Sequence, residues 1–199
     1  MTDNFSNSAV YDRAMGCMAG LCIGDAVGTT LEFSERDSYE PLEDMVGGGP
    51  FYLDPGEWTD DTSMALCIAD SLIERGEFDP EDMMKKFREW YRSGYNSHNG
   101  RCFDIGNTVR GAIHKYESYG DPFVGGDGPR SAGNGSIMRL APVPIFFRGD
   151  REKNLEVAVN QSRLTHSTNL VLDACKLLAH VLVEAINGKR KEEIFPVEM

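Results

Sequence analysis

The sequence lacks a long apolar run, a secretory signal and a disulfide pattern, which are features of membrane and secreted proteins. It contains no apolar run as long as the roughly 18 residues that a membrane-spanning helix needs. The N-terminal segment MTDNFSNSAVYDRAM has no basic stretch followed by an apolar one, so it does not read as a secretory signal. Five cysteines without C-x-x-C spacing argue against a disulfide framework. These absences predict a soluble, cytoplasmic protein with reduced thiols and no membrane partner.

Basic residues are also scarce. Lys and Arg number 20 against 32 Asp and Glu, which gives a formal net charge of −12. Such a surface repels the phosphate backbone of nucleic acids, so no nucleic-acid partner is expected. The rest of the composition suits a folded domain, because 41% of the residues are hydrophobic and 26% are charged. We expect residues 1–199 to form one domain with a sizeable core.

Alternation of apolar and polar residues at period two, the pattern of half-buried strands, persists nowhere in the chain. Apolar residues instead recur at helical spacing, and neither a repeat nor a linker divides the sequence. The predicted fold class is therefore all-α. Helical segments are expected around residues 11–27, 65–73, 80–91, 109–116 and 170–185, with further helices at 136–147 and from 150 onward.

Helix start and stop signals support these segments. Asp79 and Pro80 form an N-cap and first-turn pair, which predicts the start of the third helix. Gly76 and Gly188 follow periodic segments, where glycine commonly ends a helix. The boundaries of the second, third and last helices are therefore predicted along with their presence.

Two segments carry more specific expectations. Residues 136–147 are expected to form a short helix that Pro142 and Pro144 interrupt. The last helix is expected to bury a single apolar face, which consists of Leu170, Ala174, Leu177, Leu178, Val181, Leu182 and Ala185.

Glycines recur every fourth residue in the first helix, at Gly16, Gly20, Gly24 and Gly28. Each interior glycine costs roughly 0.5–1 kcal/mol relative to alanine, so something must offset the series. Close packing against a second helix is the expected reason at Gly16 and Gly20, whereas Gly24, its neighbour Asp25 and Gly28 are expected to border a site. Residues 34–57 follow as a long loop, a class of segment that is often functional.

The stretch EWTDDTSMAL places Thr59, Asp60 and Asp61 at the start of the second helix. Helix capping explains them in part, because carboxylates gain about 0.3–1 kcal/mol from the helix dipole there. Two carboxylates about 5 Å apart repel by about 0.8 kcal/mol in water but by about 3.3 kcal/mol at an effective dielectric constant of about 20. In a cleft, a cation would reverse this balance. Hydroxyl and carboxylate oxygens suit Mg²⁺, Mn²⁺ or Ca²⁺, and composition alone does not choose among the three.

Three other polar residues lie where a ligand could reach them. Asp104 and Asn134 occur in glycine-containing turns, whose backbone N–H groups can face an anion or a sugar hydroxyl. His166 precedes the last helix, so its ring can point into a cleft. Each has an ordinary structural alternative: a helix cap for Asp104, a turn residue for Asn134 and a structural histidine for His166. Their joint occurrence with the acidic pair favours a site.

Five segments in order, GCMAGLCIGDAVGTTLEF, EWTDDTSMAL, FDIGNTVRGA, SAGNGSIMRLAPV and LTHSTNLVLDAC, resemble the ADP-ribosylglycohydrolase family. This family includes the dinitrogenase-reductase-activating glycohydrolases and the ADP-ribosyl-arginine and ADP-ribosyl-serine hydrolases. The resemblance implies a compact all-α domain of orthogonally packed helices that holds two divalent metals, Mg²⁺ or Mn²⁺. It also implies cleavage of the bond between C1″ of ADP-ribose and a protein side chain, with an ADP-ribosylated protein or a small ADP-ribosyl compound as substrate.

The same resemblance implies roles for individual residues. Thr59, Asp60 and Asp61 would be metal ligands, and Glu32 would lie on the loop that gates the ribose. Asp104 would contact substrate near the metals, and His166 would help to position the ADP-ribose. The diphosphate and distal ribose would be held by Gly133, Asn134, Gly135 and Ser136.

One departure from the family pattern concerns the second metal-binding motif, an Asp-x-Asp-Thr in the last third of family members. After His166 the only Asp is Asp173, inside the last helix, so that motif is absent. The resemblance therefore covers about the first three-fifths of a typical member and leaves out its C-terminal third. The expected fold is unaffected, but half of the expected metal ligands are missing.

The working hypothesis is metal-assisted hydrolysis of an N- or O-glycosidic bond, with Asp60, Asp61 or Glu32 accepting the proton of the attacking water. Sequence does not choose among these three carboxylates. Two other readings stay open. One is a non-catalytic relative that binds ADP-ribose, and the other is a helical scaffold in which the acidic pair only caps a helix.

Overall fold

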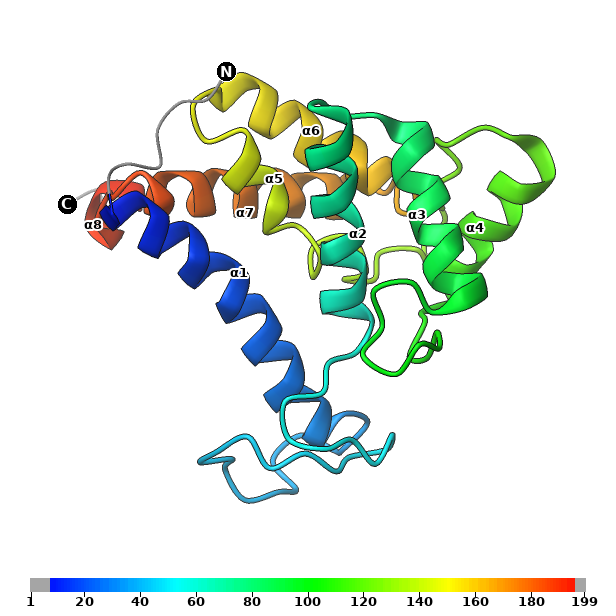
Figure 1. The fold of residues 1–199 in the computed structure, drawn as a ribbon, viewed down its shortest axis with the longest axis vertical. Coiled ribbons are helices and arrows are strands. Elements are labelled where there is room, and N and C mark those ends of the chain that lie inside the picture. Colours follow the sequence, from blue (N-terminus) through cyan, green and yellow to red (C-terminus); the bar gives the residue numbers. More distant parts are fainter. Residues whose placement is uncertain (1–7, 196–199) are drawn as a thin grey trace.

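The computed structural model describes residues 8–195, whose regular elements are all helical (Figure 1). Within these residues, the only strand-like pairings are isolated bridges between Gly48 and Leu53 and between Gly126 and His166. The prediction of an all-α fold is confirmed. The elements in chain order are α1 (Ser8–Gly28), the 3₁₀ turn η1 (Thr29–Leu31), α2 (Asp60–Arg75), α3 (Pro80–Ser93), α4 (Asn107–Tyr119), α5 (Pro142–Phe146), α6 (Arg151–Arg163), α7 (Asn169–Ile186) and α8 (Lys191–Ile194).

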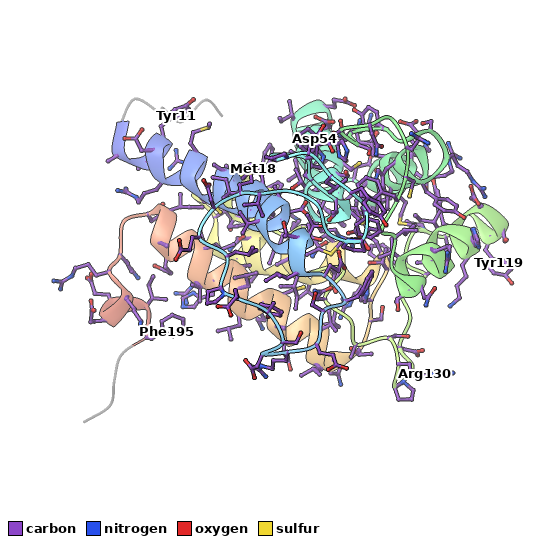
Figure 2. All side chains as sticks on the ribbon, turned by 90° about the horizontal axis from the view of Figure 1, so that it is seen from below. Tyr11, Met18, Asp54, Tyr119, Arg130 and Phe195 are labelled. Carbon is purple, nitrogen blue, oxygen red and sulfur yellow. The ribbon has the colours of Figure 1, made fainter. Side chains whose placement is uncertain are left out.

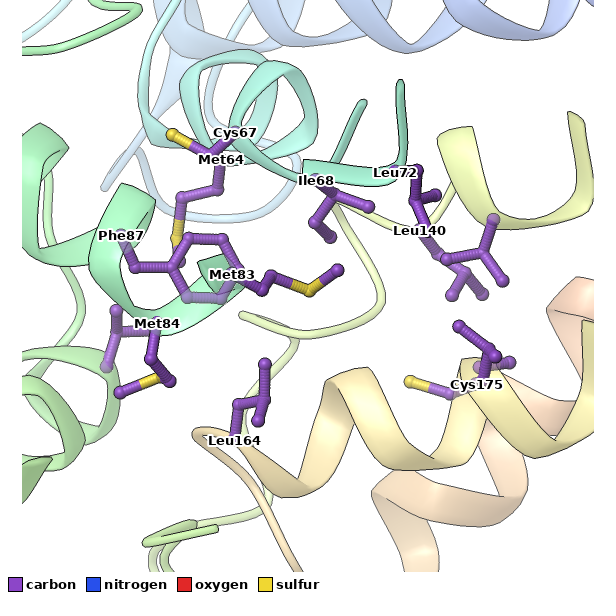
Figure 3. Close-up of a cluster of buried hydrophobic side chains, with 14 of the residues drawn as sticks. Met64, Cys67, Ile68, Leu72, Met83, Met84, Phe87, Leu140, Leu164 and Cys175 are labelled. Carbon is purple, nitrogen blue, oxygen red and sulfur yellow. The ribbon is translucent and has the colours of Figure 1, made fainter. Parts of the chain in front are cut away.

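The hydrophobic core lies between α2 and the helices that follow it, as Figure 3 shows. The cluster includes Met64 and Ile68 of α2, Phe87 of α3 and Cys175 of α7, and all four side chains are fully buried. Each large side chain buried in this way contributes about 1.5–3 kcal/mol relative to an exposed one. Helix α1 supplies no member of this cluster, so the core forms without it.

The predicted helix boundaries of α2 and α3 are confirmed, together with their physical causes. The Asp79 carboxylate accepts a hydrogen bond from the backbone N–H of Asp82, 3.0 Å away, and Pro80 opens α3. Gly76 and Gly94 end α2 and α3 in the left-handed conformation, each with φ of 71°. The long loop between η1 and α2 is also present as predicted.

Helix α1 runs along one edge of the molecule, and Tyr11 near its start lies on the opposite side from Tyr119 at the end of α4 (Figures 1 and 2). Among its described residues, only Ala14, Asp25 and Ala26 are buried. A Cβ atom added at any of the four glycines of its series would meet nothing within 4 Å. The expected close packing at Gly16 and Gly20 is therefore wrong for the described residues, because that face of α1 is open.

By length and composition alone, one helix of the described residues is apolar enough to cross a membrane. The segment Ala9–Leu31 contains an 18-residue window with a mean hydropathy of 1.3, of which 17% is buried. The expectation that no stretch reaches this length is wrong, because residues such as Ala, Cys and Leu keep the mean hydropathy of the window high although glycines and Asp25 interrupt the apolar run. Core helices of water-soluble proteins pass the same test, so the finding does not assign α1 to a membrane.

Two helical details differ from the sequence-based expectations. Pro142 opens α5 and Pro144 lies inside its first turn, so the prolines start this short helix instead of interrupting one. In α7, Leu170 and Leu177 are 71% and 57% exposed, so the predicted face is not the buried one. Because α7 is apolar on nearly every side, periodicity alone could not select the face that packs, which consists of Val171, Leu172, Cys175, Ala179, Val183 and Ile186.

Candidate functional site

Helix α2 starts where a carboxylate from another helix receives its N-terminal donors. Asp25 of α1 accepts hydrogen bonds from the backbone N–H of Thr59 at 3.0 Å and of Thr62 at 3.0 Å. The Thr59 hydroxyl also donates to Asp25, at 2.7 Å, and makes no cap bond of its own to the helix backbone. A buried carboxylate therefore replaces the usual local cap and joins α1 to the start of α2.

Asp60 and Asp61 follow immediately in the first turn of α2. Asp60 is only 7% exposed, and Asp61 is half-buried. Burial first, and then the charges of Asp61, Asp104 and Asp25, raise the pKa of Asp60 well above its ordinary value. Burial and the charge of Asp25 likewise raise the pKa of Asp61. The carboxylates are thus close enough to oppose one another's ionisation.

Two loops bring further carboxylates to the same place. Glu32 follows η1, and Asp104 precedes α4 in a left-handed backbone conformation with φ of 57°. Burial, together with a hydrogen bond to Glu32 and its charge, raises the pKa of Asp104. Left-handed geometry at a residue other than glycine costs free energy and concentrates at functional sites. In Figure 1 the loop before α4 lies beside the start of α2, and the loop after α1 leads up to that start from the end of α1.

A row of aromatic rings ties these two loops together. The ring centroids of Phe33 and Phe51 lie 6.3 Å apart, and those of Phe51 and Phe103 lie 5.3 Å apart, both edge to face. Phe33 directly follows Glu32, and Phe103 directly precedes Asp104. The ring contacts therefore run beside the hydrogen bond between the two carboxyl groups and help to hold them together.

The glycine turn around Asn134 packs against the ring of His166. A Cβ atom at Gly135 would lie 2.8 Å from Cε1 of His166, and one at Gly133 would lie 3.8 Å from Nε2. Glycine is therefore required at position 135 for this approach, whereas Asn134 itself is exposed. His166 is 2% exposed, and burial together with the charge of Arg139 lowers its pKa to about 4. The imidazole is neutral at physiological pH.

Arg139 connects the two halves of the site. Its guanidinium is fully buried and donates to the Thr165 hydroxyl at 2.9 Å, and this hydroxyl lies 2.8 Å from Nδ1 of His166. On its other side Arg139 contacts Met64 of α2, and the charge of Asp60 acts on it. The acidic start of α2 and the His166 turn are thus neighbours through one buried cation.

The structure therefore brings together most of the residues expected from sequence. The acidic group contains Thr59, Asp60, Asp61, Glu32 and Asp104, and the turn group contains Gly133, Asn134, Gly135, Ser136 and His166. Two residues that hold the site together are not predicted from sequence. Asp25 is expected only to border a site, and Arg139 has no predicted role. A sequence signal exists for both residues. Asp25 is an acidic residue that follows Gly24 in an apolar helix, and Arg139 is a single charged residue in an apolar segment.

The acidic group has the donor chemistry of a hard divalent cation. Together with Asp25 it supplies five carboxylates and one hydroxyl, which are all oxygen donors, and within residues 8–195 none of these carboxylates forms an ion pair with Lys, Arg or His. The same part of the chain contains no group of three or more His, Cys, Asp or Glu side chains already arranged to hold a metal. The oxygen atoms are of the type that such an ion binds, but they do not form a complete ligand shell. Two surface hollows of about 410 and 490 Å³ border α7 elsewhere and include none of these residues.

Comparisons of the sequence with a family model and with individual proteins both identify ADP-ribosyl hydrolases as relatives. The family model for ADP-ribosylglycohydrolase matches residues 6–198. The chain is 52% identical over 182 residues to the ADP-ribosylarginine hydrolase Tri1 of Pseudomonas putida, covering 92% of this chain and 49% of that protein. It is 35% identical to the ADP-ribosyl-[dinitrogen reductase] glycohydrolase of Rhodospirillum rubrum, covering 91% of this chain and 60% of that enzyme.

A solved structure described as an ADP-ribosylglycohydrolase-related protein complex has the same fold. It superimposes with a TM-score of 0.81 at 38% identity, and the match covers 94% of this chain and 60% of that one. The chain thus spans about half to three-fifths of the length of the relatives that it matches.

Proposed function

This chain belongs to the ADP-ribosylglycohydrolase family, and on that premise we propose that it hydrolyses the glycosidic bond between ADP-ribose and a protein side chain. The observation that carries the proposal is the convergence of carboxylates from α1, α2 and two loops beside a buried arginine and a glycine turn that holds His166. Acidic oxygens at one end and the buried charge of Arg139 at the other match a substrate with a cationic leaving group and an anionic diphosphate.

In the proposed reaction, a water oxygen forms a bond to C1″ of the ribose while the bond from C1″ to the side-chain atom breaks. The attacking water loses a proton to a carboxylate, and the departing side-chain atom gains one. Positive charge that develops at C1″ is stabilised by the nearby carboxylates. Asp61 and Glu32 are half-exposed whereas Asp60 is buried, so the first two are better placed to exchange a proton with water.

A divalent cation belongs to this proposal as well. Thr59, Asp60 and Asp61 would hold Mg²⁺ or Mn²⁺, and such an ion supplies a lowered pKa for bound water and neutralises the clustered carboxylates. The raised pKa values of Asp60 and Asp104 support this assignment, because a cation would offset the repulsion that raises them. These three residues would make up only part of a ligand shell, in line with the missing Asp-x-Asp-Thr motif.

Arginine is the proposed acceptor side chain. The Pseudomonas putida relative is an ADP-ribosylarginine hydrolase. An acidic cluster without basic partners within the described residues also attracts a guanidinium group, whose charge would be retained on the leaving side chain. An ADP-ribosylated protein, or a small ADP-ribosyl compound, would be the substrate.

The test is hydrolysis of an ADP-ribosylarginine peptide by the 199-residue chain with Mg²⁺ or Mn²⁺, followed by release of ADP-ribose. Asp60→Ala combined with Asp61→Ala is expected to abolish release, whereas Glu192→Ala combined with Glu193→Ala in the distant helix α8 should leave it unchanged. Full activity in the first double variant would exclude the role proposed for the acidic pair.

A second candidate function is binding of ADP-ribose without turnover. It is favoured by the incomplete ligand shell, since the described residues contain no preassembled group of three metal-binding side chains. Calorimetry separates the two candidates. Binding of ADP-ribose that does not depend on a divalent cation, with no release from the peptide, supports the binding function, and cation-dependent turnover supports the enzyme.

A further inference from the structure

Arg139 is a fully buried guanidinium that hydrogen-bonds to uncharged oxygens and forms no ion pair within the described residues. Its guanidinium donates to the side-chain oxygen of Gln161 at 2.9 Å, to the Gln161 backbone carbonyl at 2.9 Å and to the Thr165 hydroxyl at 2.9 Å, and it stacks on the ring of Phe87 with 4.4 Å between its carbon and the ring centroid. No carboxylate forms an ion pair with it within residues 8–195. Burying a charge without a counter-ion is costly, so a function beyond packing is expected of it.

The hydrogen bond from Arg139 determines the direction of the second hydrogen bond of the Thr165 hydroxyl. A guanidinium can only donate hydrogen bonds, so Thr165 Oγ1 accepts from it. Thr165 is 0% exposed, and among the described residues the other hydrogen-bond partner of its oxygen is Nδ1 of His166, at 2.8 Å. A buried hydroxyl proton needs an acceptor, and Nδ1 is the group that can provide one.

The tautomer of His166 follows from this chain of donors. If Nδ1 accepts from Thr165, the single proton of the neutral ring must reside on Nε2. Burial and the nearby charge of Arg139 lower the pKa of His166 to about 4, which keeps the ring neutral. Within residues 8–195 Nε2 makes no hydrogen bond, and it faces the turn of Gly133 and Gly135.

We propose that Arg139 and Thr165 are positioning residues that lock His166 in the Nε2–H form, so that Nε2 donates a hydrogen bond to an oxygen atom of bound ADP-ribose. The identity of the ligand rests on the proposed function, whereas the tautomer rests on the contacts alone. The buried charge of Arg139 behind the ring favours an anionic acceptor, so a diphosphate oxygen is the expected partner. In the Nδ1–H tautomer, Nε2 would be an acceptor and would repel that oxygen.

The tautomer can be measured directly in the 199-residue chain at pH 7. In long-range proton–nitrogen spectra of the ¹⁵N-labelled protein, a protonated and an unprotonated ring nitrogen resonate far apart. The chain contains four histidines, and the spectrum of His166→Asn identifies the signals of His166. The wild type is expected to show a protonated Nε2 and an unprotonated Nδ1.

Three variants at two threonines test the positioning role. Thr165→Val removes the hydroxyl at nearly constant volume and is expected to shift His166 toward the Nδ1–H form and to weaken ADP-ribose binding about fivefold to tenfold. Thr165→Ser keeps the hydroxyl and should retain both properties. Thr168→Val is the matched control, because the buried Thr168 hydroxyl has no hydrogen-bond partner within the described residues. It should change neither the tautomer nor the affinity.

The outcomes separate this inference from the proposed function. A protonated Nδ1 in the wild type, or an unchanged tautomer and affinity in Thr165→Val, would overturn the inference whether or not the protein binds ADP-ribose. If the wild type has the Nε2–H tautomer but does not bind ADP-ribose, the positioning role of Arg139 and Thr165 is supported. The same result would overturn the proposed function. Should Thr165→Val fail to fold, the wild-type spectrum still decides the tautomer, and Thr165→Ser must reproduce it.

Discussion

Asp25 and Thr59 lie 34 residues apart in the sequence, and the hydroxyl of Thr59 donates a 2.7 Å hydrogen bond to the carboxylate of Asp25. The same carboxylate receives backbone N–H groups of Thr59 and Thr62. The first turn of α2, with Asp60 and Asp61, is therefore positioned by α1, which otherwise contributes nothing to the hydrophobic core cluster of the described residues.

Removal of the Asp25 carboxylate should destabilise the protein and loosen the acidic site. Asp25→Ala leaves buried donors without acceptors, which is expected to cost about 2–4 kcal/mol of unfolding free energy, and Asn at this position should cost less because one oxygen remains. Chemical denaturation measures the change. Asp12→Ala, an exposed carboxylate on the same helix, should stay within about 0.5 kcal/mol of the wild type. Equal stabilities for the Asp25 and Asp12 variants would contradict this account.

The acidic group should make the cation-free protein less stable at higher pH. A carboxyl group whose pKa rises on folding binds its proton more tightly in the folded state, so stability falls as pH rises through the interval between the two pKa values. For Asp60 this interval runs from 3.8 to about 9. Asp60→Asn should therefore stabilise the cation-free protein at pH 8, by about 1–3 kcal/mol. Thermal unfolding with and without Mn²⁺ checks this, because added Mn²⁺ should stabilise the wild type and not the variant.

His166 should produce the opposite slope at lower pH. Its pKa falls from 6.5 to about 4 on folding, so the unfolded chain binds more protons between these values and stability is lost as pH falls through that interval. Replacement with Gln at position 166 should remove this contribution, so the unfolding temperature should fall less, or rise, between pH 7 and pH 5. His180→Gln serves as the control and should leave the slope in place, and a steep slope in both variants would remove His166 from the explanation.

The turn beside His166 should tolerate no side chain at position 135. Gly135→Ala places a Cβ atom 2.8 Å from Cε1 of His166, so the ring or the turn must move, and ADP-ribose affinity should fall by about tenfold or more. Gly133→Ala approaches Nε2 only to 3.8 Å, an ordinary contact, and should have a smaller effect. Calorimetric titration with ADP-ribose distinguishes the two. Equal affinities in both variants would mean that this turn does not contact the ligand.

Substitution of alanine for a glycine on the open face of α1 should not destabilise the protein. Gly20→Ala is expected to stabilise the 199-residue chain by about 0.5–1 kcal/mol, because a Cβ there meets nothing within 4 Å and alanine favours the helix. Gly94→Ala should destabilise it, because Gly94 has φ of 71° and a Cβ would collide with the backbone of Gly100. Denaturation curves for both variants provide the measurement. Loss of stability in Gly20→Ala would show that this face packs against something.

The sequence by itself determined the fold class, the long helices and several of their ends. These depend on short-range causes: apolar spacing, the cap from Asp79, and glycines such as Gly76 that accept a left-handed conformation. The residues of the acidic group and of the glycine turn could also be found, because short polar side chains at a helix start or in a glycine turn are visible locally. Which apolar face of α7 packs could not be found, because most of its sides are apolar and only its neighbours select one.

The tertiary structure alone decided how the candidate site is held together. Asp25 caps α2 from a different helix, and Arg139 joins the surroundings of Asp60 to Thr165 and His166. These contacts connect residues far apart in the chain, so no local period or motif encodes them. The proton on His166 depends on the same contacts, because the direction of a hydrogen bond is set by which donors and acceptors the folded chain brings together.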